Sequence, residues 1–259
     1  GAGSTLTIGS ITAGNIAINT ASTILNKNVT FLTGGSITLA TTTLAHAGAS
    51  AATLTMQAYG NITTTSAITA STSALTVLLQ SDYDGDSSGY ISIGGAITSN
   101  GGNITIGGGS GVISAGAGFA VGNAGQAYGV YVNNKTVAAG GGNIIVNGQG
   151  YNTTTSSNHG IYVTGASAAI TATGSGTINI TALGKGITNS GTDYGLCVDS
   201  GGVISTADGI LTVNATGGGA GTGTSNHGVY VTSGTIKTTG TGNLSVTGIK
   251  GNGTSYGVD

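Results

Sequence analysis

Three aspartates alternate with other residues in the segment Ser-Asp-Tyr-Asp-Gly-Asp-Ser-Ser-Gly at 81–89. They are Asp82, Asp84 and Asp86. Alternate carboxylates on one loop supply the oxygen ligands that a hard cation such as Ca²⁺ prefers. The segment departs from an EF-hand loop, because Gly85 comes too early and no glutamate closes it. The segment has two interpretations: a calcium site, or a polar turn between two strands.

Two histidines occupy equivalent positions in a repeat. His159 and His227 alternate there with Tyr128, Tyr194 and Tyr256. One interpretation is a pair of metal ligands or proton carriers. The other is a structural corner that either aromatic ring can fill. The alternation with tyrosine favours the structural interpretation.

Other reactive groups are too sparse to suggest catalysis. Enzymes built on parallel β-helices use paired carboxylates or an Arg or Lys base. This chain has neither Arg nor Glu, and its aspartates outside 82–86 are isolated from one another. Cys197 is the only cysteine and therefore has no internal disulfide partner. We expect a protein that is not an enzyme and needs no cofactor, calcium at 82–86 excepted.

Glycosylation sequons are frequent in a chain so rich in Asn and Thr, and most of them are expected to arise by chance. Several coincide with the start of a strand. Asn152 and Asn252 instead fall in segments that are expected to protrude as loops. They are the candidate glycosylation sites.

A short phrase of the form Tyr/His-Gly-Val/Ile/Leu-Tyr/Cys-Val recurs along the second half of the chain. Its copies begin at 128, 159, 194, 227 and 256, in steps of 31, 35, 33 and 29 residues, and the last copy is partial. A repeat of this length indicates stacked structural units. Because the last copy only opens a unit, we expect the coils to continue beyond it.

Between these landmarks the sequence alternates apolar and polar residues over short runs. Examples are 37–39, 54–56, 75–77 and 91–93, whose starting points are 17, 21 and 16 residues apart. Alternation with period two indicates half-buried strands, and short strands at this spacing indicate a parallel β-helix. We expect an all-β solenoid of ~11 triangular coils. Residues 1–127 would form coils of about 16–21 residues, and 128–259 coils of 29–35 residues with protruding loops, in one continuous solenoid.

The pair Gly-Asn stands directly before several of these runs, at 14–15, 60–61, 102–103, 142–143 and 242–243. Gly and Asn favour sharp corners. Asn side chains that stack in register can hydrogen-bond to one another along the axis of a solenoid. These pairs therefore mark one corner of the predicted coil.

The parity of the phrase separates a core face from an outer face. The residues expected to point inward are Val130, Val132, Ile161, Val163, Leu196, Val198, Val229 and Val231. The residues of opposite parity are Tyr131, Tyr162, Cys197 and Tyr230. We expect the three tyrosines to form an outward aromatic column that Cys197 interrupts. The fold is not expected to depend on these outer rings.

Composition excludes several classes of protein. The 259 residues include 52 glycines and no proline, only 5% are charged, and the net charge is −2. Collagen is excluded because proline is absent, and disorder because the chain is 38% hydrophobic with little net charge. No basic cluster would bind a nucleic acid, and no apolar run approaches the ~20 residues that span a membrane.

The stretch LTVLLQSDYDGDSSGYISIGGAITSNGGNITIGGG at 75–109 resembles filamentous-haemagglutinin-type proteins. These are large adhesins that Gram-negative bacteria export by two-partner secretion. Segments 10–20 and 54–69 are similar to the same family, so the resemblance covers residues 1–127. It implies a right-handed parallel β-helix and a role in adhesion. The family's secretion-domain motifs contain Asn-Pro, which this chain lacks, so the resemblance is to the shaft.

Two classes of function follow from these observations. The first is the structural shaft of a bacterial cell-surface adhesin or extracellular fibre. Such a shaft would associate with itself end to end or side by side and would contact an unidentified host, surface or cell ligand. The second is a carbohydrate-binding or carbohydrate-active β-helix. Aromatic or acidic groups gathered at one height would favour the second class, whereas columns along the axis, as in this sequence, favour the first.

Overall fold

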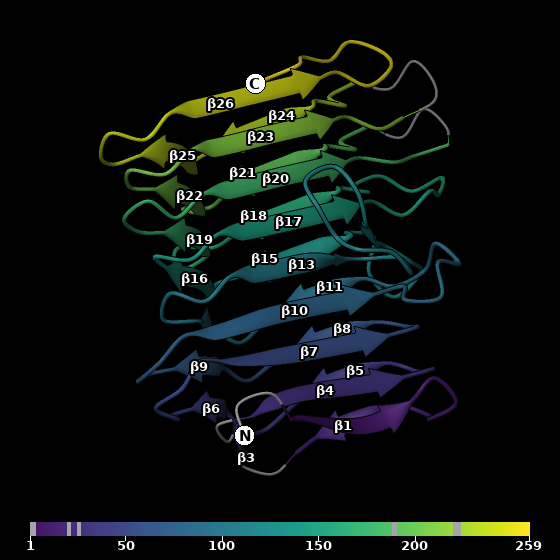
Figure 1. Ribbon diagram of the computed structural model, residues 1–259. Helices are drawn as coiled ribbons and strands as arrows, with labels where there is room; N and C mark the ends of the chain where they lie inside the picture. Colours follow the sequence, from purple (N-terminus) through teal and green to yellow (C-terminus); the bar gives the residue numbers. More distant parts are fainter. Residues whose placement is uncertain (1–3, 20–21, 25–26, 188–190, 220–223) are drawn as a thin grey trace.

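The chain winds into a parallel β-helix whose coils stack from the N-terminal to the C-terminal end (Figure 1). The structure, a computed structural model, describes residues 4–19, 22–24, 27–187, 191–219 and 224–259. Three parallel sheets form the sides of a triangular stack, which confirms the predicted fold class. None of the described residues forms a helix long and apolar enough to cross a membrane.

We name the three sheets A, B and C. Sheet A contains β1 (Thr5–Ser10), β4 (Asn28–Thr33), β7 (Ala52–Ala58), β10 (Leu75–Ser81), β13 (Ile104–Gly108), β14 (Ala120–Val121), β17 (Ile144–Gln149), β20 (Ile178–Leu183), β23 (Leu211–Thr216) and β26 (Leu244–Ile249). Sheet B contains β2 (Ile16–Ile18), β5 (Ile37–Leu39), β8 (Ile62–Thr64), β11 (Ile91–Ile93), β15 (Val130–Asn133), β18 (Ile161–Thr164), β21 (Leu196–Asp199) and β24 (Val229–Thr232). Sheet C contains β3 (Ser22–Ile24), β6 (Leu44–His46), β9 (Ile68–Ala70), β12 (Ile97–Thr98), β16 (Thr136–Gly140), β19 (Ala169–Ala172), β22 (Val203–Thr206) and β25 (Thr235–Thr238).

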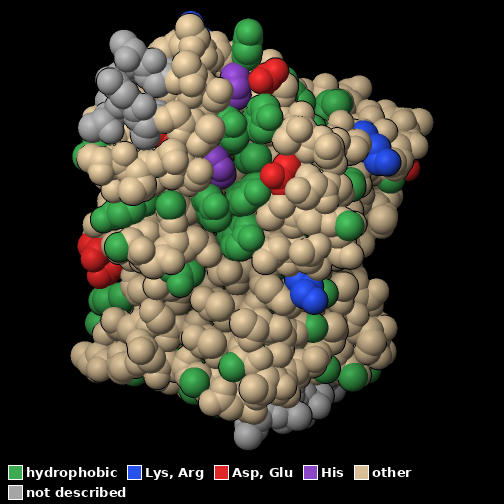
Figure 2. Space-filling model, turned by 180° about the vertical axis from the view of Figure 1, so that it is seen from behind, with side chains coloured by type: hydrophobic (Ala, Val, Ile, Leu, Met, Phe, Trp, Pro, Cys, Tyr) green, Lys and Arg blue, Asp and Glu red, His purple; other side chains and the backbone are tan. Residues whose placement is uncertain are grey.

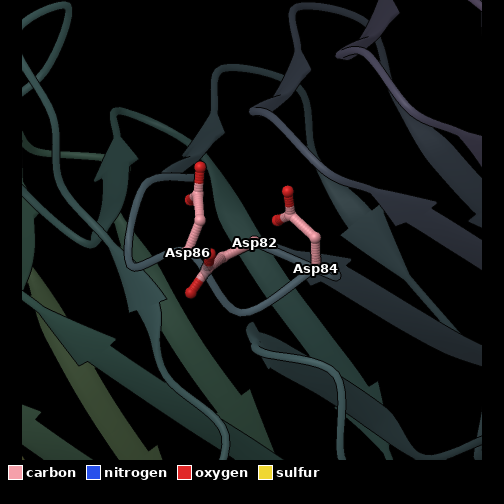
Figure 3. A group of neighbouring side chains, drawn as sticks. All are labelled: Asp82, Asp84 and Asp86. Carbon is pink, nitrogen blue, oxygen red and sulfur yellow. The ribbon is translucent and has the colours of Figure 1, made fainter.

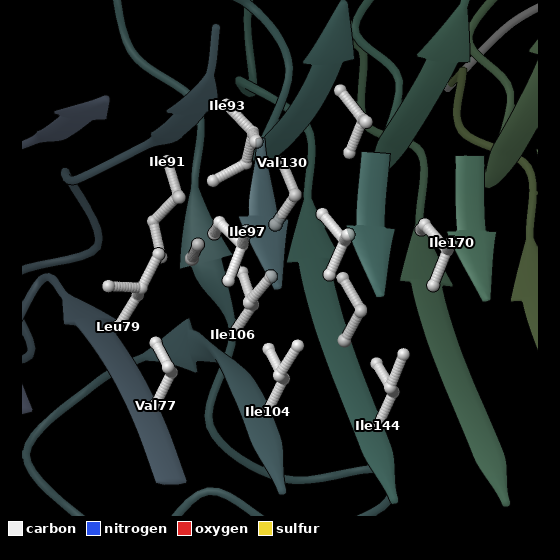
Figure 4. Packing of buried hydrophobic residues seen from close by; sticks show 14 of the residues in the cluster. Val77, Leu79, Ile91, Ile93, Ile97, Ile104, Ile106, Val130, Ile144 and Ile170 are labelled. Atoms are coloured by element: carbon white, nitrogen blue, oxygen red, sulfur yellow. The ribbon is translucent and has the colours of Figure 1, made fainter. Parts of the chain in front are cut away.

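The inward faces of the three sheets meet in one continuous apolar core (Figure 4). Its walls are mostly Ile, Leu and Val, because β-branched and aliphatic side chains suit a pleated surface that is buried on one side. Within 128–259, seven of the eight predicted inward residues are fully buried. The eighth, Val231, is half-buried and packs against the core near the C-terminal end of the stack. The parity prediction for the core is therefore confirmed.

Strand register shows how long each coil is. Copies of the repeated phrase pair directly, as Val130 does with Ile161 and Ile161 with Leu196, so the 31- and 35-residue steps are single coils. In the first half, paired residues lie 21 apart at Ile16 and Ile37, which is the upper limit of the predicted 16–21 residues. The following coils are longer than predicted, with paired residues 25 apart at Ile37 and Ile62 and 29 apart at Ile62 and Ile91. Because the coils are longer than predicted, the chain forms fewer of them. Of the ten strands of sheet A among the described residues, all but β14 lie on one path, giving nine levels and not ~11.

One corner of the coil is held by side chains that bond to the neighbouring coil's backbone. Asn61 Oδ1 accepts the N–H of Tyr90 at 3.1 Å. Asn103 Oδ1 accepts the N–H of Asn143 at 2.9 Å, and Asn143 Oδ1 accepts the N–H of Thr177 at the same distance. The sequence predicted bonds between stacked amides, and one such bond forms from Asn123 Nδ2 to Asn61 Oδ1 at 2.9 Å. The oxygens of Asn61, Asn103 and Asn143 also accept backbone N–H groups that face the corner. Each such bond ties one coil to the next.

Candidate functional site

The outer face of sheet B carries two adjoining columns of side chains in the second half of the chain. The strand column consists of Tyr131, Tyr162, Cys197 and Tyr230. The corner column consists of Tyr128, His159, Tyr194, His227 and Tyr256. In Figure 2 hydrophobic side chains gather in a hollowed band along the axis, with histidine and aspartate side chains beside it.

Strand register positions the strand column. Tyr131 pairs with Tyr162, Tyr162 with Cys197, and Cys197 with Tyr230, so these side chains stand one above another. The corner column comes just before each strand, where a glycine follows the ring. At Gly160 an added Cβ would lie 2.4 Å from the backbone N of Leu183, in sheet A. The phrase therefore requires glycine because the chain turns here in direct contact with another strand.

The rings of the two columns stack and also contact one another. Neighbouring ring centroids in the corner column lie 4.8 to 5.5 Å apart, and their planes are within 18° of parallel. Tyr131 and Tyr162 stack at 5.5 Å within the strand column. Between the columns, Tyr194 lies 4.5 Å from Tyr230, and Tyr128 meets Tyr162 edge to face at 5.0 Å. Such contacts each contribute about 0.5–1.5 kcal/mol beyond area burial.

Both histidines of the corner column accept backbone hydrogen bonds. His159 Nδ1 accepts the N–H of Tyr194 at 3.2 Å, and His227 Nδ1 accepts the N–H of Tyr256 at 2.9 Å. Burial lowers the pKa of His159 to about 3, and the nearby charge of Asp199 only partly opposes this by raising the pKa. His159 is therefore neutral at physiological pH. The ring of Tyr194 stacks between the two imidazoles, which separates them and excludes a metal ion shared by both.

Two carboxylates lie beside the rings. Tyr162 donates its hydroxyl hydrogen bond to Asp199 Oδ2 at 2.9 Å, whereas Asp199 Oδ1 is buried without a hydrogen-bond partner. Burial raises the pKa of the Tyr162 hydroxyl above its ordinary value, and the nearby Asp199 raises it further. Asp259 Oδ2 lies 3.2 Å from His227 Nε2. Carboxylates and rings thus form one packed surface.

Cys197 has the outward parity that the sequence predicted, but it is only 3% exposed. It stands between Tyr162 and Tyr230 in the strand column. Burial is the main cause that raises the pKa of its thiol, with Asp199 adding to it. A thiol held protonated and covered in this way is a poor nucleophile.

A buried polar ladder lies directly before the corner column. The N–H of Asn158 donates to Asp193 Oδ1 at 2.9 Å, and the N–H of Asp193 donates to Asn226 Oδ1 at 3.0 Å. The N–H of Asn226 in turn donates to Ser255 Oγ at 2.8 Å. Asn158, Asp193 and Asn226 are fully buried. This ladder fixes the height of each coil at the corner, and with it the stacking of the adjacent rings.

The acidic segment lies away from the aromatic columns, on the turn after β10 (Figure 3). Carboxylate oxygens of Asp82, Asp84 and Asp86 all lie within 4.8 Å of one another. Asp82 is buried, and its Oδ1 accepts the N–H groups of Ser87 at 2.9 Å and Ser88 at 3.2 Å. Burial raises the pKa of Asp82 to about 6. The turn thus places the three carboxylates together, and the buried one already serves to hold the turn.

The two candidate glycosylation sites lie where the sequence suggested, on segments outside the strands. Asn152 and Asn252 are both exposed. The backbone carbonyl of Asn252 accepts a hydrogen bond from Asn226 Nδ2 at 3.2 Å, whereas its side chain faces solvent. Both side chains are therefore accessible to a modifying enzyme.

The aromatic columns differ in kind from a sugar-binding platform. Rings that stack on one another cover each other's faces and present edges to solvent, whereas a sugar ring packs on an open face. The sequence identified the strand column but not its packing against the corner column, although the alternation of Tyr and His was visible. A comparison of the chain with protein-family models, with curated proteins and with solved structures finds no match.

Proposed function

We propose that this chain is part of the non-catalytic structural shaft of an extracellular fibre or a bacterial cell-surface adhesin. The observation that carries the proposal is the stacking of equivalent positions along the axis. The core extends through the stack, and in the second half of the chain the corner ladder and the aromatic columns repeat from coil to coil. Side chains arranged as columns strengthen a rod along its length. The resemblance of 75–109 to filamentous-haemagglutinin-type adhesins supports the same function and a location at the surface of a Gram-negative bacterium.

We propose further that coils of this kind propagate into a longer rod or filament. At one end Leu6 and Ile8 of β1 are 54% and 39% exposed, and at the other Leu244 of β26 is 46% exposed. Equivalent positions in the interior coils are buried, as Leu54 and Leu211 are. Another coil placed on either end would bury this apolar surface and pair the free strand edge. That coil comes from the same chain or from a second copy.

Negative-stain electron microscopy and sedimentation velocity over a range of concentrations test the assembly. We expect rods whose width matches one solenoid and whose length increases with concentration. Charges introduced at both ends, with Ile8→Lys and Leu244→Lys, are expected to prevent elongation, while the control Val112→Lys, on an exposed loop, leaves it intact. Monomers of 24.5 kDa at every concentration would contradict end-to-end assembly. Cleavage of glycans by the purified protein would contradict the non-catalytic role.

A further inference from the structure

A groove of about 540 Å³ lies on the outer face of sheet A. This volume falls within the ~300–1,000 Å³ typical of ligand sites. The floor spans β7, β10 and β13, so the groove extends along the solenoid axis across three levels. One wall is Tyr83 and the other is the loop that follows β13. The lining residues are Thr53, Thr55, Gln57, Thr76, Val77, Leu78, Gln80, Tyr83, Thr105, Ser110, Gly111, Val112 and Ile113.

The loop wall is fixed in place by side chains of the sheet. Gln80 Nε2 donates to the carbonyl oxygens of Gly109 at 2.6 Å and Gly111 at 2.7 Å. Asn147 Nδ2, two levels along, donates to the carbonyls of Ser114 and Ala117, both at 2.7 Å. In Figure 1 this loop is the teal segment that crosses in front of sheet A. The wall is therefore preorganised, which reduces the entropy lost when a ligand binds.

The floor is also ordered. Gln57 Nε2 donates to Gln80 Oε1 at 2.9 Å, so the two amides form a short ladder across neighbouring strands. Beside it Thr55, Leu78 and Thr105 stand in register. The floor thus offers hydroxyl and amide groups at the ~4.8 Å spacing of strands, interleaved with the methyl groups of Thr and Leu.

We propose that this groove binds an uncharged linear polysaccharide. None of the described residues that line it is Asp, Glu, Lys, Arg or His, so an ionic ligand would lose hydration without gaining a charged partner. Sugars carry hydroxyl edges and apolar ring faces, which match the mixed floor. Among the described residues, Tyr83 contacts one other ring, that of Tyr59, at 6.4 Å with the planes tilted by 45°. Its position at the wall leaves it free to pack against a sugar ring, unlike the stacked rings of sheet B.

The charges near the groove favour the same ligand. Asp84 and Asp86 are exposed on the turn that carries Tyr83, so a polyanion would meet repulsion at this rim. An extended peptide is disfavoured for another reason. Peptides that add to a sheet need a free strand edge, and the three floor strands are each paired on both sides. A glycan requires no backbone edge, only the side chains that this face presents.

This inference goes beyond the proposed shaft function and does not depend on it. The test is a titration of the intact protein with hexasaccharides derived from cellulose, chitin, starch and xylan. Binding is monitored through the NMR chemical shifts of the protein's methyl and aromatic groups. We expect saturable binding of at least one hexamer, with shifts at Thr55, Tyr83 and Val112. Heparin and polygalacturonate oligomers serve as anionic comparators and are expected to bind more weakly.

Substitutions inside and outside the groove test whether the sugar binds there. Thr55→Lys and Tyr83→Ala are each expected to weaken binding about tenfold or more, which corresponds to ~1.4 kcal/mol. Thr212→Lys is the matched control, because Thr212 occupies the same outer ladder of sheet A, outside the groove, and is also half-buried. It is expected to leave the affinity within about twofold. The proposal is overturned if no neutral hexamer binds at millimolar concentration, if the anionic oligomers bind more tightly, or if Thr212→Lys weakens binding as much as Thr55→Lys does.

Discussion

The imidazole Nδ1 of His159 accepts a hydrogen bond from the backbone N–H of Tyr194, one full coil further along the chain, at 3.2 Å. The two rings also stack, with 4.8 Å between their centroids. One side chain thus holds the next coil by both its ring face and its ring edge. Tyrosine has no ring nitrogen to accept this bond, so the two rings are not equivalent at the positions that histidine occupies.

We expect His159→Phe to lower the free energy of unfolding by about 1–3 kcal/mol at pH 7. The phenyl ring keeps the stacking, but the N–H of Tyr194 is left buried without an acceptor. Tyr194→Phe, which keeps both the ring and the N–H, is the matched control. Urea unfolding at pH 7 measures both, and equal losses in the two variants would show that the ring nitrogen contributes nothing.

His159 also makes the stability of the fold depend on pH in the acid range. Its pKa is about 3 in the folded protein, below the ordinary value of 6.5, so the fold favours the neutral ring. The stability it contributes is complete above pH 6.5 and decreases as the pH falls toward 3. The melting temperature of the wild type should therefore fall more steeply over this range than that of His159→Phe. Parallel profiles would contradict the assignment.

Tyr162 separates the contribution of a ring from that of its hydroxyl. Tyr162→Phe removes the bond to Asp199 and is expected to cost about 1 kcal/mol. Tyr162→Ser also removes contacts with Tyr128, Tyr131 and His159 and is expected to cost about 3 kcal/mol. Chemical denaturation compares them. A small cost for both would support the sequence-based expectation that the fold does not depend on these rings.

Cys197 is expected to resist thiol reagents in the folded protein. It is buried in the strand column, and its raised pKa leaves little thiolate at pH 8. The rate of reaction with an aromatic disulfide reagent should rise by at least about 100-fold when urea unfolds the chain, because unfolding of a stable coil limits access. Rapid labelling of the native protein would show that the thiol is reached from solvent.

Val163 tests the core face of β18. Val163→Asp places a carboxylate with no partner in the apolar interior and should cost more than about 4 kcal/mol or prevent that coil from folding. Thr212→Asp, on the outward face of β23 with Asn179 and Ser245 as its paired neighbours, is the control and should change stability by less than about 1 kcal/mol. Circular dichroism melting curves measure both, and wild-type stability of Val163→Asp would invalidate the assigned parity.

Asp82 makes the stability of the fold decrease as the pH rises, whereas His159 makes it decrease as the pH falls. Burial raises the folded pKa of Asp82 to about 6 from 3.8, so its protonated form is favoured in the fold. The stability it contributes is complete below pH 3.8 and is lost as the pH rises through 6. Asp82→Asn should remove this loss between pH 4 and 7 in melting experiments. A melting temperature of the variant that falls with pH as steeply as the wild type's would contradict it.

Calcium provides a second readout at the same turn. We expect calcium chloride to leave the melting temperature unchanged, because Asp82 Oδ1 already accepts two backbone N–H groups. If calcium instead raised the melting temperature at pH 7 and Asp84→Asn abolished this rise, Asp82, Asp84 and Asp86 would form a calcium site.

Local pattern was enough to predict the solenoid and its core. The parity of Val130 and Val163 identifies the buried face, because side chains alternate along a strand whatever the loops do. Coil length in 1–127 could not be obtained in the same way. The spacing between runs such as 37–39 and 54–56 measures only part of a coil, since the first lies in sheet B and the second in sheet A.

The packing of the aromatic columns and the groove on sheet A depend on geometry that the alternation of apolar and polar residues does not encode. Tyr128 and Tyr162 meet because the corner turns one ring toward the other, while the ladder from Asn158 to Ser255 ties together the corners of the following coils. The groove on sheet A depends on the loop after β13 folding back over the sheet, where Gln80 of the neighbouring strand β10 holds it. No periodicity in the sequence carries either relationship.

The hydrogen bonds between coils run parallel to the long axis, because each coil is the neighbour of the next in every sheet. A pull along that axis loads a few of these bonds at a time, so coils detach one after another from the end. A coil of 33 residues, ~4.8 Å high in the stack, becomes about 110 Å of extended chain. In a tethered rod of this construction, each released coil would extend to more than twenty times its height in the stack, and the rod would dissipate mechanical work before its anchors fail.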